Sequence, residues 1–286
     1  MLFKFLIITF PTFFLPEKTY VKYIVGVTKI WLYTRGSRIE FEIKLANYEV
    51  GERNIRFWKI EFDKQVVVTP SGYRTSRFLR GFDHAADRQW RRYGVEKITQ
   101  GNPISLVIDI GANIGEFTRA CVNHNIREIH SFEPDEIPLK CLKENISDKS
   151  VRIYGFPLGE LNKKTIFYSA PKNADSSLIK PRVKSLQKLI EIQKLDSIPI
   201  SIEQPHSVLL KMDAEGAEPE VLQGATSTLA KIKWVVIDIG PERNGKSTYF
   251  EVAEILEKNG FKVSKFSKWI LHGEKKEEFS KKSSEK

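Results

Sequence analysis

The sequence predicts an α/β protein with a Rossmann-like, doubly wound and mostly parallel sheet, an antiparallel C-terminal hairpin and a small β-rich N-terminal extension. Three observations predict it. From residue 104 onward, apolar stretches rich in β-branched residues alternate with helical patterns, which is typical of a parallel sheet covered by helices. The first stretch runs into a turn with glycines at Gly111 and Gly115. Two apolar runs within 261–272 then favour a closing hairpin.

The elements follow from these patterns in chain order. We expect parallel strands at 104–110, 127–133, 151–156, 207–213 and 233–239, and helices at 114–124, 135–146, 217–230 and 247–259. An insertion with extra strands near 165–169 and 186–195 interrupts the alternation.

Residues upstream of this pattern predict further strands. Residues 38–48 alternate apolar and polar side chains as a half-buried strand does, and 55–68 offers one or two more strands before a turn at 69–72. A helix is expected from about Asp83 to Tyr93, with Trp90 and Tyr93 three residues apart on one face.

The glycine turn has the chemistry of a nucleotide site. Gly111 and Gly115 permit close backbone approach to a ligand, but the middle glycine of the dinucleotide motif and a P-loop lysine are both absent. Asp109 before the turn suits a cationic amino-acid moiety, and Glu133 ends the next strand, where a carboxylate can bind ribose hydroxyls. S-adenosylmethionine carries both groups. The alternative is a structural turn whose acid caps its own helix.

Six segments then lie in a characteristic order. They are DIGANIG at 109–115, SFEPD at 131–135, LGE at 158–160, SSL at 176–178, LKMDAEGAE at 210–218 and EVLQGA at 220–225. In this order and spacing the chain resembles the FkbM family of S-adenosylmethionine-dependent methyltransferases. The resemblance implies a class I methyltransferase domain at 96–273. We expect an apolar and basic segment at 1–35, a β-rich and helical subdomain at 36–95, and a charged, disordered tail at 274–286.

The resemblance also implies the roles of individual residues. The cofactor S-adenosyl-L-methionine would be bound by Asp109, Gly111, Ala112, Asn113, Gly115, Glu133 and Leu158. The block at 210–218 would face the acceptor, so we expect Asp213 or Glu215 to act as general base or substrate anchor. Lys211 would hold one of these acids or bind the acceptor. No third ligand accompanies the two carboxylates, so no metal site is expected.

Several neighbouring residues keep two interpretations. Glu218 and Glu220 stand at the expected start of a helix, where interaction with the helix dipole is the simpler explanation. The pair Ser176 and Ser177 either lines the site or belongs to a plain loop.

The net charge of +10 is compatible with nucleic acid, an anionic membrane or an acidic acceptor. An arginine cluster from Arg74 to Arg92 either recognises a phosphate or carboxylate or forms a solvated helix face. Trp90 and Tyr93 hint at base stacking, but we do not expect nucleic acid as the partner.

The N-terminal residues leave two alternatives open. Residues 2–15 are strongly apolar, yet they are too few to span a membrane and Pro11 interrupts them. Residues 1–33 therefore either make peripheral contact with a membrane or pack on the catalytic domain. Cys121 and Cys141 lie in separate predicted helices, which favours a reducing compartment. We expect a cytoplasmic protein, peripheral at the membrane in the first alternative.

The expected function is an S-adenosylmethionine-dependent O-methyltransferase acting on a hydroxyl of a saccharide, glycolipid or polyketide-like acceptor. The loop at 237–243 lacks the [D/N]-P-P-[Y/F/W] signature of nitrogen methylation. The alternatives are an RNA methyltransferase and a membrane-docked, non-catalytic binding protein. Nothing in the sequence indicates an oligomeric state.

Overall fold

The computed structural model describes residues 30–34, 37–50, 53–62, 65–70, 77–78, 80–170 and 176–276. Most of the segment expected to contact a membrane or the catalytic domain, most of the expected C-terminal tail, and Arg74 lie outside the described residues. Within the described part, none of the helices is long and apolar enough to cross a membrane.

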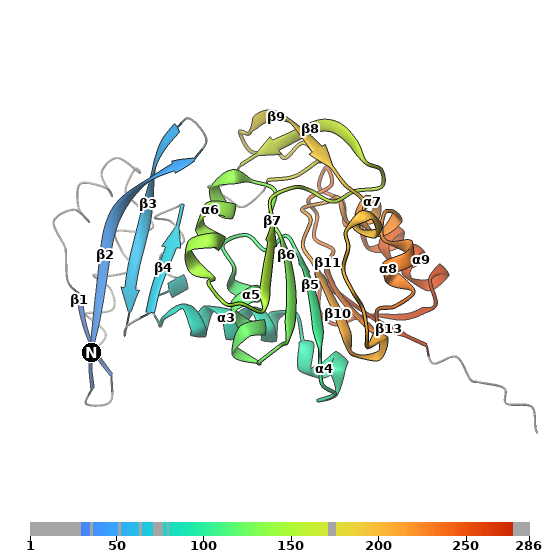
Figure 1. The fold of residues 1–286 in the computed structure, drawn as a ribbon, viewed down its shortest axis with the longest axis horizontal. Helices are drawn as coiled ribbons and strands as arrows, with labels where there is room; N and C mark the ends of the chain where they lie inside the picture. The colour runs from blue at the N-terminus through green and yellow to red at the C-terminus, as the bar shows by residue number, and fades with distance from the viewer. Residues whose placement is uncertain are drawn as a thin grey trace, which may run out of the picture.

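A seven-stranded sheet with the order β12-β13-β11-β10-β5-β6-β7 forms the centre of the molecule (Figure 1). Its strands are β5 (Leu106–Ile110), β6 (Glu128–Phe132), β7 (Val151–Tyr154), β10 (Val208–Met212), β11 (Trp234–Asp238), β12 (Phe261–Lys265) and β13 (Ile270–Lys275). The strands from β11 to β7 pair in parallel, whereas β13 pairs antiparallel with both β11 and β12. The predicted fold class, with its antiparallel C-terminal hairpin, is confirmed.

Helices cover both faces of this sheet. They are α3 (Phe82–Arg92), α4 (Val95–Thr99), α5 (Glu116–Asn123), α6 (Glu136–Asn145), α7 (Glu218–Gln223), α8 (Thr226–Leu229) and α9 (Tyr249–Lys258). In β5, Ile108 packs in one apolar cluster with Val221 of α7, while Val107 packs in another with Trp90 of α3. A strand that is buried on both faces has a nearly continuous run of apolar residues, and the run at 104–110 therefore predicts a central strand of the sheet.

The helix expected at 217–230 is two helices, α7 and α8. Gly224 lies at the break, and a Cβ atom there would sit 2.0 Å from the carbonyl oxygen of Gly159. The carbonyl of Gly224 also accepts a hydrogen bond from the backbone N–H of Asp196. The helix is interrupted because the backbone at 159–160 packs against Gly224 and the Asp196 N–H bonds to its carbonyl. Both contacts come from distant segments, so the local sequence does not indicate them.

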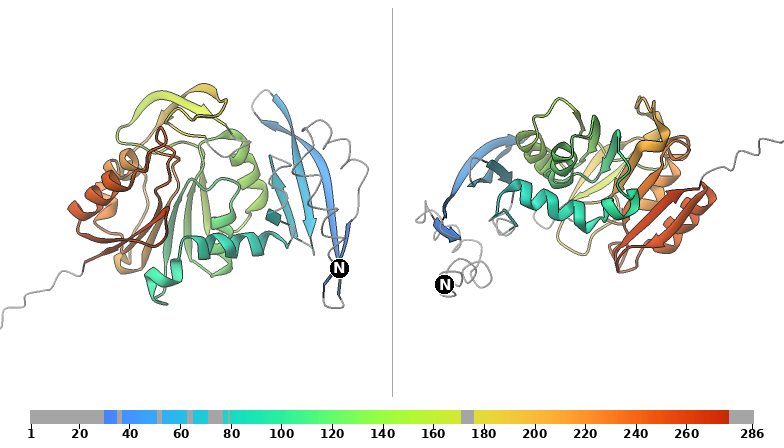
Figure 2. Two further views of the ribbon diagram at one scale, coloured as in Figure 1. Left: turned by 180° about the vertical axis from the view of Figure 1, so that it is seen from behind. Right: turned by 90° about the horizontal axis from the view of Figure 1, so that it is seen from below.

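The N-terminal extension forms a four-stranded antiparallel sheet of β1 (Ile30–Thr34), β2 (Ser37–Val50), β3 (Arg53–Phe62) and β4 (Gln65–Thr69). Figure 2 shows it at the opposite end of the molecule from α9. Its edge strand β4 meets α6, where the Asn145 amide accepts a hydrogen bond from Val68 N at 2.7 Å and donates one to Val68 O at 2.9 Å. Asn145 also donates to Ile114 O at 2.9 Å, so this contact connects the extension to the glycine turn.

The insertion forms a hairpin of β8 (Lys163–Ser169) and β9 (Leu186–Ile192), followed by short 3-10 helices at Leu195–Ser197 and Pro205–Ser207. Figure 1 shows this hairpin above the large sheet. It lies over the carboxyl ends of the parallel strands, where ligands of parallel α/β folds bind.

Candidate active site

A cavity of about 670 Å³ lies at the carboxyl ends of the parallel strands. The predicted site residues that line it are Gly111, Ala112, Asn113, Glu133, Leu158, Lys211, Asp213 and Glu215. Asp109 and Gly115 are not among its lining residues. The structure thus brings five of the seven expected cofactor residues and all three expected acceptor residues to one cavity.

The glycine turn adopts backbone conformations that ordinary residues rarely take. Gly111 has a φ of 75° and Gly115 a φ of 97°. A Cβ atom on Gly111 would lie 1.9 Å from the carbonyl oxygen of Asp213, so glycine is required where the turn meets the end of β10. A Cβ atom on Gly115 would lie 2.8 Å from Leu142 of α6. Gly115 therefore permits close packing of α5 on α6 and does not face the cavity.

Glu133 lies at the cavity wall between the turn and the start of α6. Its Oε2 accepts a hydrogen bond from Asn113 N at 2.8 Å, and its Oε1 accepts one from Asp135 N at 2.9 Å. Burial raises the pKa of this carboxyl to about 8, against the effect of the two backbone donors. Two fixed carboxyl oxygens at the cavity wall are suitably placed to form hydrogen bonds with vicinal hydroxyls.

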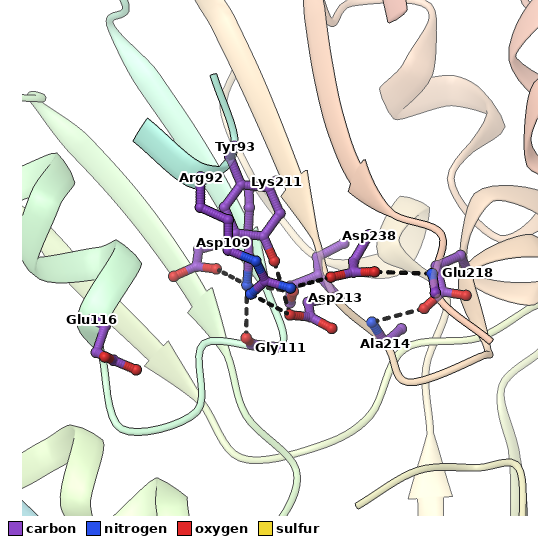
Figure 3. A network of polar contacts seen from close by, with 12 residues as sticks. Arg92, Tyr93, Asp109, Gly111, Glu116, Lys211, Asp213, Ala214, Glu218 and Asp238 are labelled. Carbon is purple, nitrogen blue, oxygen red and sulfur yellow. Dashed lines mark hydrogen bonds and ion pairs between the residues drawn. The ribbon is translucent and has the colours of Figure 1, made fainter. Parts of the chain in front are cut away.

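Asp109 lies beneath the cavity and is fully buried. Its Oδ1 is 3.1 Å from Lys211 Nζ, and its Oδ2 accepts a hydrogen bond from Thr118 Oγ1 at 2.7 Å. Lys211 also donates to the carbonyl oxygen of Gly111 at 2.8 Å (Figure 3). In this structure the pair Asp109–Lys211 therefore supports the glycine turn from below.

Asp213 faces the cavity and is held by two residues at the end of α3. The Tyr93 hydroxyl donates a hydrogen bond to its Oδ2 at 2.8 Å, and Arg92 Nη1 lies 3.9 Å from the same oxygen. Arg92 also donates to Asp238 at the end of β11 (Figure 3). Burial, and secondarily the charge of Asp213, raise the pKa of Asp238 to about 7, opposed by Arg92. Burial raises the pKa of Tyr93 well above its usual 10, so this hydroxyl stays a donor.

Glu218 organises the loop that carries Asp213 and Glu215. Its Oε1 accepts hydrogen bonds from Ala214 N and Gly216 N, each at 3.0 Å, and its Oε2 accepts one from Thr248 Oγ1 at 3.1 Å. Burial raises its pKa to about 8. Its position in the first turn of α7 fits the expected dipole interaction, but its hydrogen bonds give it a second role that was not expected from the sequence.

Glu220 pairs with Arg243, whose Nε donates to the carbonyl oxygen of Gly216 at 2.8 Å. This ion pair also supports the loop at 213–216. Neither glutamate of the pair Glu218 and Glu220 lines the cavity, whereas Glu215 does.

The serine pair of the insertion lines the cavity and connects its two sides. Ser176 Oγ donates a hydrogen bond to Asp135 Oδ2 at 2.7 Å, near Glu133. Ser177 Oγ donates to the carbonyl oxygen of Glu215 at 2.7 Å, where Glu215 has a φ of 50°. Of the two interpretations of this pair, the structure supports the one in which it lines the site.

Trp90 and Tyr93 do lie on one helix face, and both contact Phe117, with ring centroids 5.9 and 5.5 Å away. They are 5% and 1% exposed, so the hint of base stacking was wrong. The role of Tyr93 toward Asp213 was missed. In the sequence, this role is indicated only by the position of a tyrosine at the end of the helix before the first parallel strand.

Within the described residues, no group of three or more His, Cys, Asp and Glu side chains is arranged to hold a metal ion. Cys121 of α5 and Cys141 of α6 are both buried free thiols.

The model of the methyltransferase FkbM domain family matches residues 109–263, which are more than half of the chain. The chain therefore belongs to this family. It is 29% identical to the hexuronic acid methyltransferase AglP of Haloferax volcanii over 136 residues, which are 46% of this chain and 54% of that protein. It is 22% identical to the AMB antimetabolite synthetase AmbE of Pseudomonas aeruginosa over 214 residues, which are 60% of this chain and 10% of that protein. The chain thus spans about half the length of the first relative and a tenth of the second.

Two solved structures are similar at low identity. One is a putative S-adenosylmethionine-dependent methyltransferase from Listeria monocytogenes, with a TM-score of 0.40 and 11% identity over 67% of this chain and 100% of that chain. The other is an S-adenosylmethionine-dependent methyltransferase from Aquifex aeolicus, with a TM-score of 0.39 and 13% identity over 71% of this chain and 91% of that chain.

Proposed function

We propose that this protein is an S-adenosylmethionine-dependent O-methyltransferase that methylates a hydroxyl of a saccharide-containing acceptor. The observation that carries the proposal is one cavity with the Gly111 turn and Glu133 on one side and the Asp213 carboxylate on the other. Membership of the FkbM family supports methyl transfer. Among the acceptors expected from the sequence, the similarity to a hexuronic acid methyltransferase supports a saccharide.

The residues at the turn fit this cofactor chemically. Glu133 offers two carboxylate oxygens at the cavity wall for ribose hydroxyls, and Phe132 and Leu158 offer apolar surface for a base. Gly111 brings backbone to the cavity without a side chain in the way. When bound, S-adenosylmethionine supplies an electrophilic methyl group on a sulfonium centre. Lys211 holds the turn in place from below and is a positioning residue in this proposal.

Asp213 serves as the general base. Its carboxylate would accept the hydroxyl proton of the acceptor as the methyl carbon exchanges its bond to the sulfonium sulfur for a bond to the acceptor oxygen, with S-adenosylhomocysteine as the leaving group. The Tyr93 hydrogen bond orients this carboxylate, and the bridge that Arg92 makes to Asp238 holds the same region from the other side. Glu215, on the same loop, anchors an acceptor hydroxyl. Holding base and acceptor in one geometry is the main contribution that a protein makes to such a displacement.

The test uses methyl-labelled S-adenosylmethionine with a panel of neutral and acidic saccharides, and product analysis by mass spectrometry and NMR. We expect a methyl ether on a sugar hydroxyl. Asp213→Asn is expected to lower kcat by about 10²-fold or more, while the Kd for S-adenosylhomocysteine stays unchanged.

The exposed carboxylate variant Asp148→Asn, outside the cavity, is the matched control and should retain the wild-type rate. Full activity of Asp213→Asn would contradict the assignment of Asp213 as the general base. Methyl transfer to RNA and to no saccharide would support the RNA methyltransferase alternative instead.

A further inference from the structure

A group of arginines from α3 and from the turn before it lines the same cavity. They are Arg77, Arg88, Arg91 and Arg92. The sequence left open whether this cluster recognises an anion or is a solvated basic face, and its position at the cavity favours recognition. Arg80, from the same segment, is exposed and does not line the cavity.

These arginines differ in their partners. Arg92 pairs with Asp238, and Arg91 pairs with Asp87 one helical turn away. Arg77 Nη1 is 3.5 Å from Glu116 Oε2, which is a long contact for an ion pair of this kind. Arg88 makes no hydrogen bond or ion pair with any residue that the structure describes, so its guanidinium is available to a ligand.

Helix α3 fixes the distance between Arg88 and Arg92, which contacts Asp213 and Asp238. Arg88 precedes Arg92 by four residues, so the two side chains share a helix face and lie about 6 Å apart along the helix axis. The opposite face carries Ala86 and Trp90, which are buried in the core with Phe117. A ligand group at Arg88 would therefore sit about one helical turn from the Arg92–Asp213 contact, a span comparable to one sugar ring.

We propose that Arg88, with Arg91 beside it, binds a carboxylate on the acceptor. This inference rests on the proposed function and narrows the acceptor to an acidic saccharide. A guanidinium binds a carboxylate through two parallel hydrogen bonds, which fixes orientation as well as charge. The cavity is also lined by acidic residues, whose negative charges disfavour a dianionic phosphate more than a singly charged carboxylate. They are Glu116, Glu133, Asp213, Glu215, Asp238 and Glu242.

The same chemistry exists in the cofactor, whose amino-acid moiety carries a carboxylate. The experiment therefore measures two affinities for each variant of the full-length protein. The first is the Kd for S-adenosylhomocysteine by calorimetry. The second is the Kd of the S-adenosylhomocysteine complex for D-glucuronate, D-glucose and inorganic phosphate, by ligand-observed NMR titration.

We expect the wild-type complex to bind glucuronate at least tenfold more tightly than glucose or phosphate. Arg88→Gln should abolish the preference for glucuronate over glucose and leave the Kd for S-adenosylhomocysteine within about twofold. Arg80→Gln removes the same charge from the same segment outside the cavity and should keep the preference. Unchanged S-adenosylhomocysteine binding in both variants also shows that they are folded.

Four results of the saccharide and phosphate titrations would overturn the inference. They are equal binding of glucuronate and glucose by the wild type, absence of glucuronate binding, an unchanged preference in Arg88→Gln, and tighter binding of phosphate than of glucuronate. A tenfold or greater loss of S-adenosylhomocysteine affinity in Arg88→Gln would assign the arginine to the cofactor's carboxylate and overturn it as well. Failure of the wild type to bind S-adenosylhomocysteine is a distinct result, since it contradicts the proposed function itself.

Discussion

The hydroxyl of Tyr93 donates a 2.8 Å hydrogen bond to Oδ2 of Asp213, a residue 120 positions further along the chain. Tyr93 directly follows α3, and Asp213 directly follows β10. The orientation of the proposed base therefore depends on a helix that precedes the whole parallel sheet. The apolar packing of α3 against the large sheet, with Tyr93 itself buried, makes this contact possible.

Tyr93→Phe should lower kcat by about tenfold or more, because the Asp213 carboxylate loses the donor that orients it. Phenylalanine fills the same space, so the Kd for S-adenosylhomocysteine should not change. Steady-state kinetics and calorimetry measure the two quantities. Tyr154→Phe removes a comparable hydroxyl, which bonds to His130 outside the cavity, and should leave kcat unchanged. An unaltered kcat in Tyr93→Phe would show that the hydrogen bond has no catalytic role.

Lys211→Met should destabilise the fold by about 3–5 kcal/mol, because it leaves the buried carboxylate of Asp109 without its cation. The double variant Lys211→Met with Asp109→Asn should be more stable than Lys211→Met alone, since no unpaired buried charge remains. Urea unfolding of the three proteins measures this. If the double variant were the least stable, the ion pair would not be the cause of the loss.

Stability should fall as the pH rises from 7 to 8.5 in the cofactor-free protein. Burial raises the pKa of both Glu133 and Glu218 to about 8 in the folded state. The unfolded chain has already lost these protons near the ordinary value of about 4.5, so between the two values the folded state binds more protons. The stabilisation is present at low pH and is lost as the pH rises through about 8.

The pKa values of His130 and His272 are lowered by burial, so these two histidines change the free energy of unfolding only below about pH 6.5, outside this window. Urea unfolding at pH 7 and 8.5 measures the slope, and Glu218→Gln should reduce it. A free energy of unfolding that increases over this range would contradict the raised pKa values.

The local parts of the site could be predicted from the sequence. The turn at Gly111 and the acid at Glu133 each follow an apolar strand, and the strand ends of a parallel sheet meet at one edge. The pairing of Asp109 with Lys211 could not be predicted, because it depends on the parallel register of β5 with β10, which sets these two residues side by side. That register buries Asp109 beneath the cavity, and its expected contact with the amino group of the cofactor stays a prediction.

Contacts between distant segments explain the other differences. The helix expected at 217–230 breaks at Gly224 because the Gly159 backbone packs there. Tyr93 reaches Asp213 only because α3 packs beside α5, where Trp90 and Tyr93 both contact Phe117. Strand and helix periodicity report burial on one element, but they do not report which elements meet.

The most direct test of the central claim is calorimetric titration of S-adenosylhomocysteine into wild type, Glu133→Ala and the exposed control Glu257→Ala. We expect saturable binding to wild type and to Glu257→Ala, with an affinity lower by at least about tenfold in Glu133→Ala, equivalent to ~1.4 kcal/mol. Equal affinity in Glu133→Ala and wild type, or no binding to the wild type, would contradict the assignment of this cavity as a cofactor site.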